Sequence, residues 1–321
     1  MRLGLSIPFD DAGLREQGGQ YARLADAGYT DFWSVEASRW DAFTPLVHAL
    51  AHVPGAHVGT GIVSAFTRGP ALLASSAAAL ADLAGGRCTI GVGSSSDVIV
   101  ERWNGIPFQK PLTRTRDMVR FLRGALAGER ITEKFASFEV RGFRLDAPPE
   151  RQPSVMVAAL RERMLAMAAA ETDGPILSWL GIDDLGAVLP HAARAREVAA
   201  RLYVCPSDEA PAVRAGARRV LAAYLNVPVY RAFQEWLGRG EQLEPMWDAW
   251  ARGDRREAVA LIPDQTVDEL VIWGSPETCA EQVLRYVAGG VTIPIVQPLA
   301  IGMTMAEGAE RLADSLTRVT S

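Results

Sequence analysis

The sequence predicts an α/β protein, a single (β/α)8 TIM barrel with two insertions. Short apolar runs rich in β-branched residues alternate with longer stretches rich in Ala, Leu and Arg, and the alternation occurs eight times. Strands that are apolar throughout are typical of a parallel sheet buried on both faces. The length of 321 residues is ordinary for one barrel with insertions. A doubly wound sheet, the structural alternative, has fewer strands and leaves the eighth one unexplained.

Each predicted element follows from local signals. Apolar runs mark strands, helical periodicity marks helices, and glycines such as Gly28 and the Gly85-Gly86 pair mark helix ends. The predicted strands are residues 2–8, 31–36, 56–64, 88–93, 154–159, 175–179, 201–205 and 291–297. The predicted helices are residues 14–27, 43–52, 70–83, 113–126, 161–171, 185–200, 276–288 and 305–318.

Two insertions interrupt this rhythm inside one domain that spans residues 1–321. The first, about residues 94–150, contains a helix and then the segment 131–145, which is expected to form a hairpin on the barrel rim. The second, about residues 207–275, is helical and rich in tryptophan. Insertions of this length are usually lids or oligomer contacts. The alternative is a set of extra helices that pack on the flank of the barrel.

The composition indicates a folded protein and argues against two classes of partner. Hydrophobic residues make up 49% of the chain, charged residues 22%, and the net charge is −5, so neither nucleic acid nor an anionic membrane surface is an expected partner. The three cysteines, Cys88, Cys205 and Cys279, are widely spaced and predict reduced, buried thiols in a cytoplasmic protein. No apolar run is long enough for a membrane span. As a separate expectation, the protein is predicted to form a homodimer.

Several common catalytic chemistries lack their residues. His48 and His52 stand four residues apart on one predicted helix, but no third ligand completes a metal site, so no metal is expected. The sequence contains no GxSxG, HExxH or GxxxxGK[ST] motif. Hydrolase, zinc-protease and P-loop functions are therefore not supported.

Six segments together resemble the luciferase-like monooxygenase superfamily, and within it the F420-dependent oxidoreductases. They are GYTDFWSVE (28–36), GTGIVSAFTRGPALLA (59–74), LADLAGGRCTIGVGSS (80–95), WNGIPFQKPLTRTRDMVRFLRGALAGE (103–129), VAALRERMLAMAAAETDG (157–174) and LVIWGSPETCAEQVLRYVAGGVTIPIV (270–296). Their order and spacing carry the resemblance across nearly the whole chain. The resemblance implies a TIM barrel with a flavin or deazaflavin at the C-terminal ends of its strands, where barrel enzymes build their active sites.

The resemblance implies a cofactor site assembled from several strand ends. A cis peptide between Gly61 and Ile62 is expected behind the central ring of the cofactor, where a glycine in a strand also permits close approach. Hydroxyl and backbone donors after the fourth strand suit an anion, and Arg161 and Arg163 at a helix N-terminus suit a phosphate. The alternatives are a Ser-rich helix cap and a solvated helix face. The predicted cofactor-binding residues are Gly61, Ile62, Ser64, Gly93, Ser94, Ser95, Ala159, Arg161, Arg163, Met164 and Trp179.

This chain departs from the family pattern where proton transfer is expected. Many relatives carry an acid followed by histidine after the second strand, and here Ala37 follows Glu36. The predicted catalytic residues are Glu36 and Ser38; the alternative is that Glu36 pairs with Arg68 and shapes the pocket. Ser96 stands where some deazaflavin reductases have a glutamate, which argues against their sugar-phosphate substrate. The predicted substrate walls are Trp40, Phe66 and Trp103.

The resemblance thus implies an F420-dependent oxidoreductase that transfers a hydride between C5 of the deazaflavin and a small organic substrate. One alternative keeps the fold and uses reduced FMN and oxygen, as a flavin-dependent monooxygenase. A second alternative, prompted by Ala37 and Ser96, is a non-catalytic flavin-binding protein.

Overall fold

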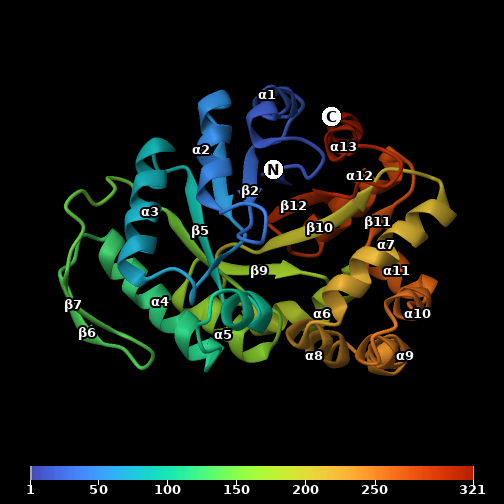
Figure 1. The fold of residues 1–321 in the computed structure, drawn as a ribbon. Helices are drawn as coiled ribbons and strands as arrows, with labels where there is room; N and C mark the ends of the chain where they lie inside the picture. The colour runs from blue at the N-terminus through green and yellow to red at the C-terminus, as the bar shows by residue number, and fades with distance from the viewer. Residues whose placement is uncertain (1, 321) are drawn as a thin grey trace.

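Eight parallel strands close into a barrel in the computed structural model, which describes residues 2–320 and the side chains of residues 2–316 (Figure 1). Around the barrel they are β1 (Gly4–Ser6), β2 (Asp31–Ser34), β3 (His57–Thr60), β5 (Cys88–Gly93), β8 (Ser154–Ala158), β9 (Gly174–Ser178), β10 (Ala199–Cys205) and β12 (Ile293–Pro298). Parallel pairing of β12 with β1 closes the ring. The predicted TIM barrel is confirmed.

The barrel interior is filled by side chains rather than left open. Trp33 lies at its centre with an apolar cluster of Met156, Ile176, Ala199, Ile293 and Ile295. Gly59 makes room for this indole, because a Cβ on Gly59 would lie 2.6 Å from Cε3 of Trp33. Successive residues of a strand point to opposite sides, so every second residue beyond this cluster points into the mouth of the barrel.

The surrounding helices form the outer layer (Figure 1). They are α1 (Gly18–Asp26), α2 (Phe43–His52), α3 (Pro70–Leu83), α4 (Pro111–Leu126), α5 (Glu162–Glu171), α6 (Leu185–Val188), α12 (Pro276–Ala288) and α13 (Met305–Thr320). The predicted bounds of α2, α3 and α12 are confirmed. The chain ends meet, since α13 packs on α1 and α12 and the Tyr29 hydroxyl donates to the Ala309 carbonyl at 3.1 Å. The three cysteines are buried and unpaired.

The predicted helix over residues 185–200 is wrong. Helix α6 ends at Val188, a 3-10 turn covers Leu189–Ala192, and β10 already begins at Ala199. Pro190 has no N–H to continue the helical ladder, and Ala199 and Ala200 pair with both β9 and β12. Burial in the sheet outweighs the helical preference of alanine. The helix predicted over 14–27 likewise begins as a 3-10 turn, Leu14–Glu16, before α1.

The first insertion contains the predicted hairpin. β6 (Ile131–Lys134) and β7 (Glu139–Phe143) pair antiparallel at the edge of the molecule (Figure 1). Phe135 and Phe138 fix the hairpin by packing against Phe121 of α4. The insertion also contains a π-helical turn, Val98–Trp103, that the sequence pattern did not predict.

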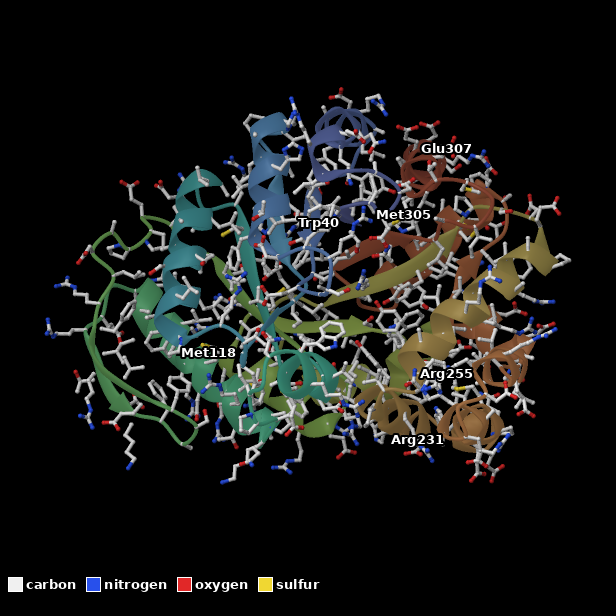
Figure 2. All side chains as sticks on the ribbon, in the orientation of Figure 1. Trp40, Met118, Arg231, Arg255, Met305 and Glu307 are labelled. Carbon is white, nitrogen blue, oxygen red and sulfur yellow. The ribbon has the colours of Figure 1, made fainter. Side chains whose placement is uncertain are left out.

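The second insertion packs on the barrel flank and has its own apolar core. It consists of α7 (Ala210–Leu225), α8 (Pro228–Trp236), α9 (Gly240–Ala251), α10 (Arg255–Ala260) and α11 (Asp264–Leu270), followed by β11 (Ile272–Trp273), which extends the sheet beside β10. Arg231 and Arg255 lie on the outer helices (Figure 2) and stack over Trp247 and Trp250 at 4.5 and 3.9 Å. These tryptophans are thus used in packing. No helix among the described residues has the length and apolar content needed to cross a bilayer.

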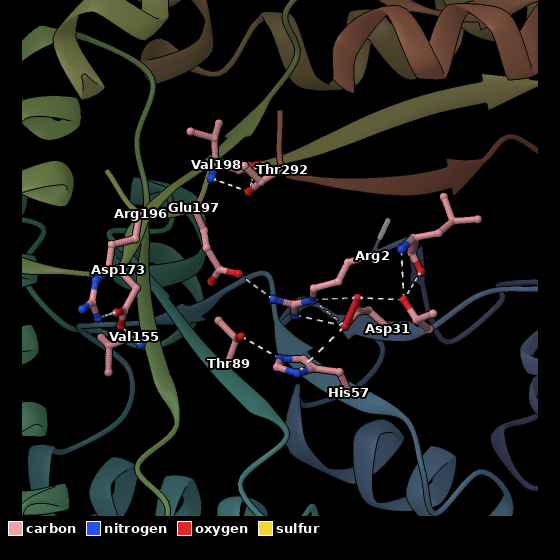
Figure 3. A network of polar contacts seen from close by, with 12 residues as sticks. Arg2, Asp31, His57, Thr89, Val155, Asp173, Arg196, Glu197, Val198 and Thr292 are labelled. Atoms are coloured by element: carbon pink, nitrogen blue, oxygen red, sulfur yellow. Dashed lines mark hydrogen bonds and ion pairs between the residues drawn. The ribbon is translucent and has the colours of Figure 1, made fainter. Parts of the chain in front are cut away.

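An ionic network closes the end of the barrel where the strands begin (Figure 3). Arg2 donates to the fully buried Asp31 at 3.0 Å and to Glu197 at 2.7 Å. His57 joins it through Nε2, which lies 2.8 Å from the Thr89 hydroxyl. Burial, helped by the positive charges of Arg2 and Arg87, lowers the pKa of His57 to about 3, even though Nδ1 lies 4.0 Å from the carboxylate of Asp31. This end of a barrel serves stability rather than catalysis.

The neutral state of His57 makes stability depend on pH. Its folded pKa lies below the ordinary 6.5, so as pH falls the unfolded chain takes up this proton first. The contribution is complete above about pH 6.5 and is lost toward pH 3. Urea titrations at several pH values measure this effect. As pH falls, the free energy of unfolding of the wild type should drop by up to about 1 kcal/mol more per pH unit than that of His57→Gln, whose amide can still bond to Thr89. Equal slopes for the two proteins would contradict this assignment.

Candidate functional site

The mouth of the barrel is shaped on one side by a cis peptide between Gly61 and Ile62, as the resemblance implied. It lies between β3 and the short β4 (Val63–Ser64), which pairs with β5. The Gly61 N–H donates to the Ser34 carbonyl at 2.6 Å, and the Glu36 N–H donates to the Ile62 carbonyl at 3.1 Å. The Ile62 side chain packs toward the Trp33 cluster. Strands β2, β3 and β5 thus meet in one ridge, the Gly61–Ile62 bulge.

Gly93 is needed for this ridge. A Cβ on Gly93 would lie 2.8 Å from Cγ1 of Ile62 and 3.1 Å from the Ala158 Cβ. The glycine therefore lets Ile62 occupy the end of β5. Gly93 thus packs beside the bulge, and its predicted contact with a cofactor stays a prediction.

Glu36 is held by an arginine at the rim. Nε of Arg68 donates to Oε1 of Glu36 at 2.8 Å, and Arg68 also lies 3.6 Å from Asp41 and stacks on Phe43. The structure therefore contains the pair with Arg68 that was predicted as the alternative to a catalytic role for Glu36. Oε2 of Glu36 is buried and has no hydrogen-bond partner among the described residues, so one carboxylate oxygen remains for a ligand or water. Ser38 is exposed on the same loop, and its catalytic role stays a prediction.

The serines after β5 divide into two groups. Ser94 and Ser95 are half-buried at the mouth, and Ser95 adopts a left-handed backbone with φ of 62°. Ser96 instead accepts the Ile99 N–H at 3.3 Å and so begins the turn over Val98–Trp103.

Ser64, on β4, is buried, and its hydroxyl accepts the N–H groups of Phe66 and Thr67. That hydroxyl is thus used to stabilise its own loop.

The end of β8 leads directly into the N-terminus of α5. Ala159 is buried, and Arg161 is the residue that precedes the helix. Arg161 and Arg163 are both exposed, and neither side chain has an ionic partner within the described part of the chain. Met164 packs against the main core. Arg161 and Arg163 outnumber Glu162, the acidic residue of the first turn of α5. Together with the helix N-terminus they give this corner a net positive charge, which suits a phosphate group.

The four predicted aromatic residues have different environments. Phe66 is buried against Phe108 at 5.2 Å, while Trp40 is half-buried on the β2–α2 loop beside Arg39 (Figure 2). Trp103 is 55% exposed and is thus turned toward solvent. Trp179 is buried and stacks on Tyr203 at 3.6 Å, in a left-handed backbone with φ of 57°. Phe66 and Trp179 therefore form parts of the packed wall around the mouth.

The sequence reasoning missed the polar residues on the far side of the mouth. Arg201 and Gln297 follow Ala199 and Ile295 of the interior cluster by two residues, so both point into the mouth. Nε of Arg201 donates to Oε1 of Gln297 at 3.1 Å. An arginine inside an otherwise apolar strand was the available signal, because a charge is costly there unless it serves a site.

The second insertion completes this far wall. Tyr224 of α7 lies 5.0 Å from the Trp179 ring and 6.0 Å from the ring of Tyr230 on α8. The Tyr203 hydroxyl lies 3.4 Å from that of Ser178. Burial raises the pKa of Tyr230 to about 12; the nearby Tyr224 acts in the same direction and Arg201 acts against it. This phenol is therefore neutral at physiological pH.

The two sides of the mouth face each other across the barrel. In the ring of strands, β10 is four strands from β3 in either direction. The Gly61–Ile62 bulge and Arg201 therefore lie on opposite walls. An aromatic ring laid on the bulge would have its other face toward Arg201 and the tyrosines.

Comparison with known proteins agrees with this architecture. The model of the luciferase-like monooxygenase family matches residues 1–292. A Mycobacterium tuberculosis protein named as a coenzyme F420-dependent oxidoreductase is 29% identical, covering 92% of this chain and 94% of its own. The 5,10-methylenetetrahydromethanopterin reductase of Methanolobus tindarius is 25% identical, covering 85% of this chain and 87% of its own. The F420-dependent tetrahydromethanopterin reductase structure from Methanopyrus kandleri superposes with a TM-score of 0.82, at 19% identity and full coverage of both chains.

Proposed function

The chain belongs to the luciferase-like monooxygenase family, and from this premise we propose that it is an F420-dependent oxidoreductase acting on a small organic substrate. The support is the end-to-end sequence similarity to the mycobacterial protein named for that cofactor. The observation in this chain that carries the proposal is the electropositive corner at α5, where Arg161 and Arg163 have no ionic partner among the described residues.

The residues present fit such a cofactor. Arg161, Arg163 and the α5 N-terminus would hold its phosphate by charge-assisted hydrogen bonds. Ser94 and Ser95 are half-buried after β5 and would lie near the ring, which would rest on the Gly61–Ile62 bulge. Without a ligand the Ser94 hydroxyl donates to the Ser95 carbonyl at 3.4 Å, a long hydrogen bond that a cofactor oxygen would replace. The buried, unpartnered Oε2 of Glu36 offers an acceptor at the edge of the bulge.

When bound, F420 gives or accepts a hydride at C5, and the protein supplies position, a proton path and exclusion of water. The bulge would support one face of the ring, and the wall of Trp179, Tyr203, Tyr224 and Tyr230 would limit water on the other. Arg68 holds Oε1 of Glu36, so Oε2 is the atom that would exchange a proton with a substrate or a water.

Titration with F420 and with FMN by isothermal calorimetry tests the proposal. We expect F420 to bind, and we expect Arg161→Gln/Arg163→Gln to weaken it by at least about tenfold, with a smaller effect at high salt. Arg219→Gln is the matched control, since Arg219 is also an exposed helical arginine. Tight binding of FMN without binding of F420 would overturn the proposal in favour of a flavin-dependent monooxygenase, the activity for which the family is named.

Turnover separates an enzyme from a non-catalytic flavin-binding protein. Once F420 binding is established, oxidation or reduction of the bound cofactor by any small organic substrate supports the proposal. The homodimer stays a prediction, which sedimentation analysis of the full chain would decide.

A further inference from the structure

The mouth of the barrel contains a cation, Arg201, that forms no ion pair within the described part of the chain. Arg201 has no carboxylate within ion-pairing distance among residues 2–316; its hydrogen bonds there go to Gln297, which is neutral. Asp10 attracts it from a distance, and that carboxylate already lies 3.5 Å from Arg39. Burial acts to lower the pKa of Arg201, but Asp10 and the negative charges that the surrounding tyrosines acquire at high pH outweigh it and raise this pKa. The guanidinium is therefore charged at physiological pH, where the tyrosines are neutral.

Gln297 holds the Arg201 guanidinium in place and leaves some of its N–H groups free to bind a ligand. Gln297 donates through Nε2 to the Pro298 carbonyl at 3.1 Å, which orients Oε1 toward Arg201. A guanidinium has five N–H groups. Gln297 takes Nε–H and one hydrogen of Nη2, so both hydrogens of Nη1 and the second of Nη2 have no partner within residues 2–316. Those two nitrogens form the fork that binds a carboxylate in bidentate fashion.

We infer that the substrate carries a carboxylate, which Nη1 and Nη2 of Arg201 hold opposite the Gly61–Ile62 bulge, with its apolar body against Tyr224 and Tyr230. A partly buried charge is costly when unpaired, so an anion that arrives with the substrate offsets this cost. One guanidinium among neutral side chains matches one negative charge. A phosphate would bring a second charge next to aromatic rings, where it has no partner.

The inference rests on the proposed function only for the position of the cofactor. Arg201 lies on the wall opposite the bulge, so a carboxylate bound there would place the rest of the molecule over the open face of a ring that rests on the bulge. The anion site itself can be tested whether or not F420 binds.

Benzoate and benzamide are the probes, because they share size and shape and differ in charge. Calorimetric titration of the full chain, with and without saturating F420, should give benzoate an affinity at least about tenfold higher, and added NaCl should reduce that preference. Equal affinities in the wild type would overturn the inference without any variant. Tighter binding of phenyl phosphate than of benzoate would overturn the assignment of a carboxylate.

Arg201→Met tests the residue itself. We expect benzoate to bind at least about tenfold more weakly, while benzamide and F420 change by less than about twofold. Arg255→Met is the matched control, because Arg255 also stacks on an aromatic ring but lies on the exposed α10. A loss of F420 affinity with benzoate affinity unchanged would overturn the inference. Benzoate binding through Arg201 without F420 binding would refute only the proposed cofactor.

Discussion

Gly61→Trp should weaken F420 binding by at least about a hundredfold, a loss of about 2.7 kcal/mol. A Cβ at Gly61 would lie 3.5 Å from Cε3 of Trp33, in ordinary contact, so this position faces the interior above that indole. Trp33 is fully buried in the packed cluster below, and a second indole cannot descend into it. The new side chain must therefore fill the mouth, where the cofactor is proposed to lie.

Two further variants make this result interpretable. Gly61→Ala adds only the tolerated Cβ and should bind F420 far better than the tryptophan variant. Gly55→Trp is the matched control, because Gly55 is exposed before β3, at the opposite end of the same strand, with no atom within 4 Å of an added Cβ. Circular dichroism checks the fold of each. Wild-type affinity in Gly61→Trp would show that the cofactor lies elsewhere.

Arg239→Met should lower the free energy of unfolding by about 3–5 kcal/mol. Arg239 is 7% exposed and holds three partners, Asp184 at 2.9 Å, Glu269 at 2.6 Å and Gln234 at 3.2 Å. These contacts join α8 and α11 to the turn that follows β9. Methionine keeps the apolar stem but leaves the buried carboxylate of Asp184 unpaired, and urea denaturation measures the loss.

A second substitution identifies the cause. In Arg239→Met/Asp184→Asn no buried charge is left alone, and the asparagine can still accept the Gly181 N–H that Asp184 accepts at 2.6 Å, so part of the stability should return. Arg252→Met is the control, since Arg252 pairs with Glu257 on the surface and should cost less than about 1 kcal/mol. An equal loss in both single variants would contradict the buried network.

The Arg239 network also bears on the mouth. Gln234 accepts from Arg239 and donates through Nε2 to the Trp179 carbonyl at 2.8 Å. The second insertion is thereby connected to the aromatic wall beside Arg201. Its connection to the site was not visible in the sequence, because Trp179 and Gln234 are 55 positions apart.

Elements with strong local signals were predicted within a residue or two. Helix α3 starts at Pro70 and is followed by Gly85 and Gly86, whose positive φ values end it. Strand β5 matched its predicted bounds because it is an apolar run between a turn and a glycine, which is also a local signal. The segment 185–200 failed because its alanines favour a helix locally, whereas pairing with two distant strands decides their conformation.

The site was predicted only in part. The bulge at Gly61-Ile62 and the arginines before and within α5 came from the family resemblance and the helix signals. The pairing of Glu36 with Arg68 was predicted as the alternative to a catalytic role for Glu36, and the structure contains this pair. Arg201 and Gln297 lie 96 positions apart and become neighbours only when β10 pairs with β12.

The sequence by itself determined the barrel and its eight strands. Those properties follow from periodicity and turn residues, which act over a few neighbouring positions. The tertiary structure decided which residues line the mouth. Closure of the sheet brings β3 and β10 to opposite walls, so a bulge from one faces Arg201 from the other, an arginine with no ionic partner among residues 2–316. Such a pairing depends on which strands become neighbours across the barrel, and no local pattern encodes that.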